Sequence, residues 1–148
     1  MKIALCSDEP YPVHHVIKDE LKRRRHVVVP FGSFLSGRDE PWAEVAERAA
    51  LSVAKGECEE GIFLCWTGTG ISMAANKVHG VRAALCVDPG TAAGARVWNH
   101  ANILCLSNRL LSGDMVKEIL AAWFETERGD KGAAGVTKMN EVDRRHRT

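Results

Sequence analysis

Apolar residues follow two periodicities that alternate along the chain. Short, nearly continuous apolar runs predict strands at residues 3–6, 26–29, 61–65, 82–87 and 102–106. Apolar residues at helical spacing predict helices at residues 13–21, 43–53, 71–77, 91–99 and 114–124. Strands that alternate with helices in this way are typical of a parallel sheet with crossover connections. We therefore expect an α/β fold, with a single doubly wound, Rossmann-like sheet of five parallel strands and helices on both faces.

This regular pattern ends near residue 124, which divides the chain into two parts. With 148 residues the chain has the length of one domain, and we assign residues 1–124 to it. Residues 125–148 are rich in glycine and end in a basic cluster, Arg144, Arg145, His146 and Arg147. We expect this segment to be a C-terminal arm or tail that either contacts a partner subunit or is frayed.

Charge and apolar content exclude several classes of protein. Lys and Arg number 20 and Asp and Glu 19, so there is no broad basic field for a nucleic acid or an anionic membrane. No apolar stretch is long enough to cross a bilayer, and the amino terminus lacks a signal-peptide pattern. The five cysteines are odd in number, and neither they nor the histidines have the spacing of a zinc site. We expect a cytoplasmic protein with free thiols and no metal site.

Ligands of doubly wound sheets gather where the parallel strands end, and this chain has polar residues there. The segment after the third predicted strand reads CWTGTG, from Cys65 to Gly70. Its glycines permit a tight turn whose amides face an anion, such as a developing oxyanion. Cys65 beside these dipoles is a candidate thiolate base or nucleophile. The alternative is a buried strand cysteine next to an ordinary turn.

The same glycines allow a second interpretation, a dinucleotide-binding turn with Asp88 as the ribose-binding acid. That fingerprint requires GxGxxG, but the chain reads GTGISM from Gly68, so Met73 stands where the third glycine belongs. We therefore favour the anion-binding turn.

Three stretches resemble one known family. KIALCSDE at 2–9, GIFLCWTGTGISMAANKVHGVRAALC at 61–86 and ARVWNHANILCLSNRL at 95–110 are similar to ribose-5-phosphate isomerase B and galactose-6-phosphate isomerase. The resemblance extends from residue 2 to about residue 124. It implies a doubly wound fold, a homodimer with the active site at the subunit interface, and interconversion of an aldose and a ketose without a metal. We expect no cofactor.

The resemblance also implies roles for single residues. Cys65 matches the base that moves a proton between the first two sugar carbons through a cis-enediolate, and Thr67 matches a polar residue beside it. The other matches bind the substrate: the enediolate loop of Gly68, Thr69 and Gly70, the hydroxyl contacts Asp8 and Asn99, and the phosphate-side Arg109.

Three departures from the family bear on the substrate. Glu9, which we place among the substrate-binding residues, stands where the family has a histidine, and Trp98 stands where the family has its ring-opening histidine. The phosphate-binding arginines of the family's C-terminal arm have no counterpart before Arg144. A carboxylate at position 9 repels a phosphate. The substrate is therefore either a different sugar phosphate or a sugar without phosphate at that end.

His100 is our candidate for the ring-opening acid, because an imidazole transfers protons near neutral pH; His14, Tyr11 and Glu9 are further candidates. We predict an aldose–ketose isomerase with Cys65 as base, acting on a sugar phosphate similar to ribose 5-phosphate or on a related sugar. The alternative is a non-catalytic sugar-phosphate-binding or partner subunit of the same fold. We expect a homodimer or a homotetramer.

Overall fold

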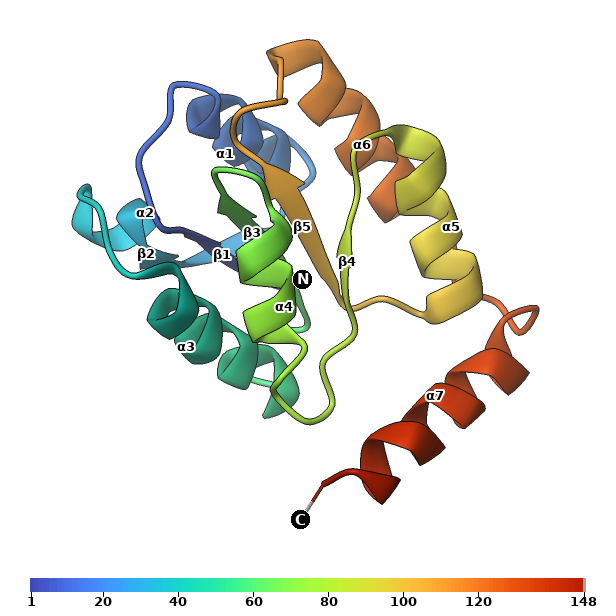
Figure 1. The fold of residues 1–148 in the computed structure, drawn as a ribbon. Coiled ribbons are helices and arrows are strands. Elements are labelled where there is room, and N and C mark those ends of the chain that lie inside the picture. Colours follow the sequence, from blue (N-terminus) through green and yellow to red (C-terminus); the bar gives the residue numbers. More distant parts are fainter. Residues whose placement is uncertain (148) are drawn as a thin grey trace.

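A computed structural model describes residues 1–147, and its strands and helices follow the pattern of the sequence (Figure 1). The strands are β1 Lys2–Ser7, β2 Val27–Gly32, β3 Glu60–Cys65, β4 Ala83–Leu85 and β5 Ile103–Ser107. The helices are α1 His14–Arg23, α2 Ser33–Ser36, α3 Trp42–Ala54, α4 Thr69–Ala75, α5 Pro89–Asn99, α6 Gly113–Glu125 and α7 Ala133–Arg145. All paired strands are parallel, in the order β2-β1-β3-β5-β4. The predicted five-stranded parallel sheet is confirmed.

Helices cover both faces of the sheet, which explains why the strands are apolar almost throughout. Successive side chains of a strand point to opposite faces. Along β3, Ile62 and Leu64 pack with α1, α5 and α6, whereas Phe63 and Cys65 pack with α3 and α4. The thiol of Cys65 therefore lies on the α3–α4 side of the sheet, at the end of its strand.

Four elements differ from the prediction. Strand β2, expected at 26–29, is Val27–Gly32 and takes in the start of the predicted loop. The fourth strand, expected at 82–87, is only Ala83–Leu85, because it pairs with β5 at these three residues alone. The short helix α2 lies in a segment predicted as a loop. Helix α7 lies in the segment predicted as an arm or tail, whose last residue, Thr148, is outside the described part of the chain. Its apolar stripe is weak, since Val136 is its one buried residue, so periodicity did not reveal it.

Helix α7 stands apart from the sheet (Figure 1) and packs against α5. Its far end is held by polar contacts: Asp143 pairs with His79, and the guanidinium of Arg147 donates to the carbonyl of Lys77 at 2.7 Å. Between residues 125 and 147, the segment predicted as an arm thus contains an ordered helix that contacts the rest of the chain near both of its ends.

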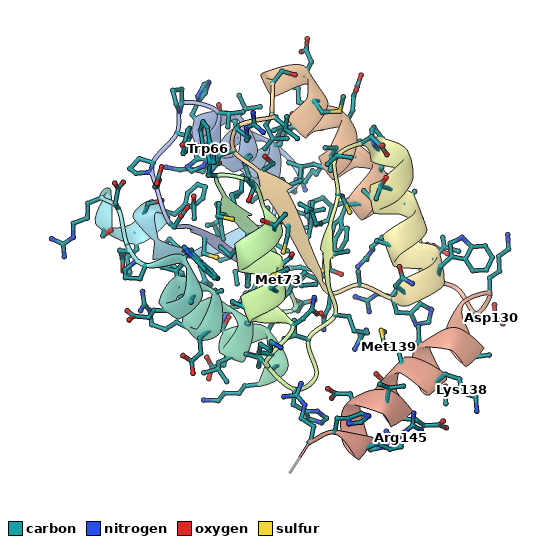
Figure 2. The ribbon with its side chains drawn as sticks, in the orientation of Figure 1. Trp66, Met73, Asp130, Lys138, Met139 and Arg145 are labelled. Carbon is teal, nitrogen blue, oxygen red and sulfur yellow. The ribbon has the colours of Figure 1, made fainter. Side chains whose placement is uncertain are left out.

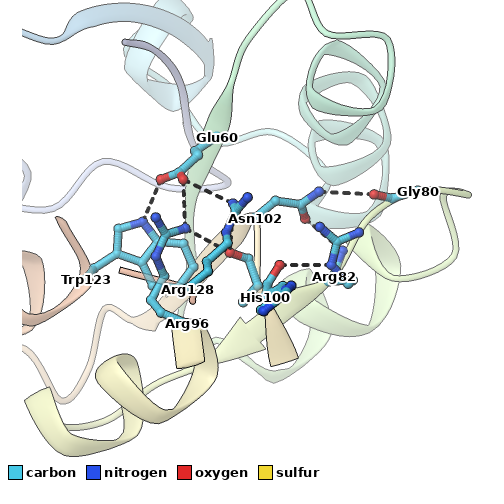
Figure 3. A network of polar contacts seen from close by, with 9 residues as sticks. Glu60, Gly80, Arg82, Arg96, His100, Asn102, Trp123 and Arg128 are labelled. Carbon is cyan, nitrogen blue, oxygen red and sulfur yellow. Dashed lines mark hydrogen bonds and ion pairs between the residues drawn. The ribbon is translucent and has the colours of Figure 1, made fainter. Parts of the chain in front are cut away.

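A buried carboxylate joins the amino edge of the sheet to two helices and to the connection between α6 and α7 (Figure 3). Glu60 begins β3, and its side chain is 6% exposed. One oxygen accepts hydrogen bonds from Arg96 of α5 at 2.7 Å and from Arg128, between α6 and α7, at 3.2 Å. The other oxygen accepts from the indole N–H of Trp123 of α6 at 2.9 Å. Both arginines also donate to the carbonyl of Ala101, so the network holds the turn between α5 and β5 as well.

We expect Glu60→Gln to lower the free energy of unfolding by about 3 kcal/mol, because it leaves the guanidinium groups of Arg96 and Arg128 without a counter-charge. Urea denaturation followed by circular dichroism measures the loss. Glu59→Gln is the matched control, since Glu59 is exposed and its carboxylate accepts only from the amide of Lys2 at 3.4 Å. A loss for Glu60→Gln below about 0.5 kcal/mol, the range of ordinary surface substitutions, contradicts this role.

Candidate active site

The carboxyl edge of the sheet places Cys65 beside an amide that points at its sulfur. Cys65 is the last residue of β3 and is 5% exposed. The N–H of Gly68 donates to its Sγ at 3.2 Å. Gly68 has a φ of +79°, and a Cβ there would lie 2.5 Å from Leu85 Cδ1 and 3.0 Å from the carbonyl of Leu106. Only glycine fits this turn, which aims the positive end of an amide dipole at the thiol.

The rest of the loop offers further donors. The hydroxyls of Thr67 and Thr69 are hydrogen bonded at 2.6 Å, and the Thr69 amide donates weakly to Thr67 Oγ1 at 3.4 Å. Within residues 1–147 the amides of Gly70 and Ile71 have no backbone or side-chain acceptor. The sequence predicted that the amides of the whole loop face an anion. In the structure the Gly68 amide faces the sulfur of Cys65, and the amides of Gly70 and Ile71 remain available to an anion.

Asp8 directly follows β1, the strand that neighbours β3. Strands β1 and β3 pair as far as Ser7 and Leu64, so Asp8 and Cys65 are the next residues at this edge. Asp8 is 8% exposed, and its Oδ1 is buried without a hydrogen-bond partner in residues 1–147. Burial, and then the charge of Glu9, raise the pKa of Asp8. A buried acceptor without a donor is costly, and a ligand hydroxyl would satisfy it.

The loops after β1, β3 and β5 contribute four side chains to a row at the same edge: Glu9, Tyr11, Trp66 and Arg109. Figure 2 labels Trp66. The hydroxyl of Tyr11 donates to Glu9 Oε2 at 3.1 Å, and the rings of Tyr11 and Trp66 are 5.8 Å apart. The guanidinium carbon of Arg109 lies 5.8 Å from the centre of the Trp66 ring, and the Arg109 amide donates to the Trp66 carbonyl at 3.1 Å. Glu9 and Arg109, both predicted site residues, therefore stand at the two ends of one row.

Sequence reasoning missed Asn108, which joins two of these loops. Its amide donates to the carbonyl of Cys65 at 2.9 Å, and its side chain donates to Ser7 Oγ at 3.2 Å. Its Oδ1 lies 2.8 Å from Nε2 of His14, a candidate acid that is buried and whose pKa burial lowers. Asn108 directly follows β5, so the strand-end rule that singled out Asp8 could have found it too.

Asn99 and His100 lie at the opposite edge of the sheet. Helix α5 runs back from the carboxyl end of β4 and ends at Asn99, which lines a cavity of about 370 Å³ between β4 and α7. The carbonyl of His100 accepts from Arg82 Nε, just before β4, at 2.8 Å. Within one chain the structure therefore brings Asp8, Glu9, Cys65, the Thr67–Gly70 loop and Arg109 together, and leaves Asn99 and His100 apart.

Two other candidate chemistries find no support at this edge. The Oδ1 of Asp88 accepts a hydrogen bond from the amide of Thr91 at 2.7 Å, so Asp88 caps the amino end of α5. The carboxylate that a dinucleotide site would use for the ribose is therefore already engaged. Among the residues the structure describes, no group of three His, Cys, Asp or Glu side chains is placed to hold a metal ion.

Comparison with known proteins finds relatives over nearly the whole chain. The family described as Ribose/Galactose Isomerase matches residues 3–141. Ribose-5-P isomerase B of Listeria innocua is 32% identical over 99% of this chain and 100% of its own length. D-erythrulose-4-phosphate isomerase of Pectobacterium atrosepticum is 33% identical over 90% of this chain and 89% of its own. The solved structure of Clostridium thermocellum ribose-5-phosphate isomerase B has a TM-score of 0.91 and 37% identity, covering 99% of this chain and 100% of that one.

These matches confirm the resemblance seen in the three sequence stretches, and with it the prediction of an aldose–ketose isomerase that acts on a sugar phosphate. The match includes the segment from Cys65 to Gly70 as well as the strands that position it. Because one family accounts for nearly the whole chain in sequence and in fold, the chain belongs to the ribose/galactose isomerase family.

Proposed function

We propose that this isomerase moves a proton between the first two carbons of an open-chain aldose phosphate, with Cys65 as the base. One observation carries the proposal: the sulfur of Cys65 lies at the carboxyl edge of the sheet, with the Gly68 amide 3.2 Å away and Asp8 directly after the adjacent strand. A thiolate at this position is stabilised by the amide dipole. The relatives named for ribose 5-phosphate and D-erythrulose 4-phosphate support a phosphorylated sugar.

The reaction needs one carbon-bound proton and one oxygen-bound proton to move. The Cys65 thiolate takes the proton from C2, and the electrons of that bond form the C1=C2 double bond while negative charge develops on O1. The amides of Gly70 and Ile71, which have no acceptor within residues 1–147, stabilise that charge. The hydroxyl pair of Thr67 and Thr69 next transfers the proton of O2 to O1, which moves the negative charge to O2. The thiol then returns its proton to C1 as the electrons on O2 form the C2=O double bond, which leaves a ketone at C2.

Two further side chains hold the substrate in this scheme. The buried, unpartnered Oδ1 of Asp8 accepts a sugar hydroxyl. Arg109 makes no ion pair with any of residues 1–147 and stacks on Trp66, so its donors are available for the phosphate. Glu9 stands at the far end of the row from Arg109, where it accepts a hydroxyl rather than the phosphate.

The working unit is proposed to be a homodimer, because one chain leaves Asn99 and His100 at the edge away from Cys65. The 370 Å³ cavity beside Asn99 and the separate helix α7 lie at that edge, and β4, which pairs on one side only, borders the cavity; these features support contact with a second copy. In the dimer, Asn99 of the partner subunit contacts sugar hydroxyls and His100 of the partner subunit serves as ring-opening acid. Residues 125–148 are then the arm that contacts the partner, whether as a dimer or within a tetramer.

The cytoplasm is the proposed site of action. None of the helices in residues 1–147 has both the length and the apolar content to cross a membrane. All five cysteines are free thiols, and all are buried. Free thiols are the usual state in a reducing compartment.

Cys65→Ala is expected to lower kcat by about 10²- to 10⁴-fold, the usual contribution of a general base. The assay is deuterium incorporation from solvent next to the carbonyl, followed by NMR, over tetrose, pentose and hexose substrates with and without phosphate. Cys58→Ala is the control, because it removes an equally buried thiol from the connection before β3. A folded Cys65→Ala variant with full activity contradicts the assignment. Binding without exchange for every sugar favours the non-catalytic subunit instead.

A shared active site is tested by mixing variants. Cys65→Ala and Asn99→Ala are each expected to be nearly inactive. Refolding them together in equal amounts restores about a quarter of the wild-type sites, because half of the dimers are mixed and each mixed dimer has one intact site. The control mixture combines the Cys65→Ala variant with a double variant that carries both Cys65→Ala and Asn99→Ala. It restores no activity, because neither chain has Cys65. If the first mixture also stays inactive, Asn99 does not act across the interface.

A further inference from the structure

Two aromatic side chains lie between the charged ends of the active site. We call Tyr11 and Trp66 the aromatic rim. We propose that this rim limits the substrate to four- and five-carbon sugar phosphates; this inference rests on the proposed function above. The rim also fixes the orientation of the sugar, with the phosphate at Arg109 and the hydroxyl end at Glu9. The rim would then exclude six-carbon sugar phosphates.

The order of the strands sets the direction of the bound sugar. Strand β3, which ends in Cys65, lies between β1 and β5. The carboxylates of Asp8 and Glu9 follow β1, and the guanidinium of Arg109 belongs to the loop after β5. The base is therefore flanked by anionic groups on one side and by a cation on the other. A phosphate is repelled by the first side and attracted by the second, so only one orientation places it favourably.

The same order limits the length of the sugar. Neighbouring strands are about 4.8 Å apart, so the base and the phosphate-binding loop are separated by roughly one strand spacing plus the reach of the Arg109 side chain. Trp66, the residue directly after the base, lies between Tyr11 and Arg109, with ring contacts to both. A longer sugar with its reacting carbons at Cys65 and its phosphate at Arg109 has to bulge toward this indole.

The main chain that carries the indole is held in place, although Trp66 itself is 51% exposed. The carbonyl of Trp66 accepts from Ser107 Oγ at 3.0 Å and from the Arg109 amide at 3.1 Å. Tyr11 is fixed by its hydrogen bond to Glu9 and by the ring of His14, whose centre is 5.9 Å away. A wall anchored from three loops discriminates by shape, which a mobile side chain would not do.

A matched pair of variants tests the limit on length. Trp66→Ala removes the wall, whereas Trp66→Phe keeps an aromatic ring in it. The measurement is kcat/KM for D-erythrose 4-phosphate, D-ribose 5-phosphate and D-galactose 6-phosphate. We expect Trp66→Ala to reduce the preference for the five-carbon over the six-carbon substrate by about 10- to 100-fold, the size of discrimination that one carbon unit provides. Trp66→Phe is expected to retain most of the preference.

An unchanged preference in Trp66→Ala, or an equal loss for all three substrates, overturns the role of the rim. Neither result affects Cys65 as the base, which the exchange assay tests on the wild-type protein. If the wild-type protein exchanges no substrate, it is the proposed function that fails.

Inhibition by inorganic phosphate tests the orientation. Arg109→Ala is expected to raise the inhibition constant at least about tenfold, because it removes a charge-assisted donor pair. Glu9→Gln is expected to change it little, because the phosphate lies at the other end of the rim. Phosphate inhibition that tightens about tenfold in Glu9→Gln and is unchanged in Arg109→Ala means that the sugar lies the other way round, and it overturns the proposal.

Discussion

Parallel pairing of β1, β3 and β5 is the constraint on which the rest of the structure depends. Parallel strands end at the same edge of a sheet, so residues far apart in the chain become neighbours there. Asp8, Cys65 and Asn108 each stand at the end of one of these strands. Hydrogen bonds then join the three loops, as when the Asn108 amide donates to the carbonyl of Cys65. The active site is the consequence of this shared edge.

The opposite edge of the sheet is held by charge. Glu60 neutralises Arg96 and lies near Arg128, and its other oxygen accepts the indole N–H of Trp123. Burying a carboxylate costs free energy, and here several hydrogen bonds offset that cost. The network also fixes the carbonyl of Ala101, next to the turn that carries Asn99 and His100. One edge therefore carries the base, and the other carries the residues proposed to reach the partner subunit.

The chemistry at the carboxyl edge is set by environment more than by residue type. Cys65, Cys6 and Cys105 all pack on the same side of the sheet, yet only Cys65 stands at a strand end with an amide at its sulfur. Burial raises the pKa of Cys6 and of Cys105 well above the usual value of a thiol, so both remain neutral. Asp8 and Glu9 are likewise adjacent carboxylates with different surroundings, one buried and one hydrogen bonded to Tyr11.

The sequence by itself determined the local features of this protein. Its periodicity predicted all five strands, the strand-end rule singled out Cys65 and Asp8, and the three family-like stretches predicted the isomerase family. It did not reveal α7, the pairing of Asn108 with His14, or the contact of Tyr11 with Trp66. Glu60 and Trp123, likewise, are 63 residues apart in the chain. Periodicity reports which face of a strand or helix is buried, whereas the partners of a buried polar group depend on strand order and helix packing, which only the tertiary structure decided.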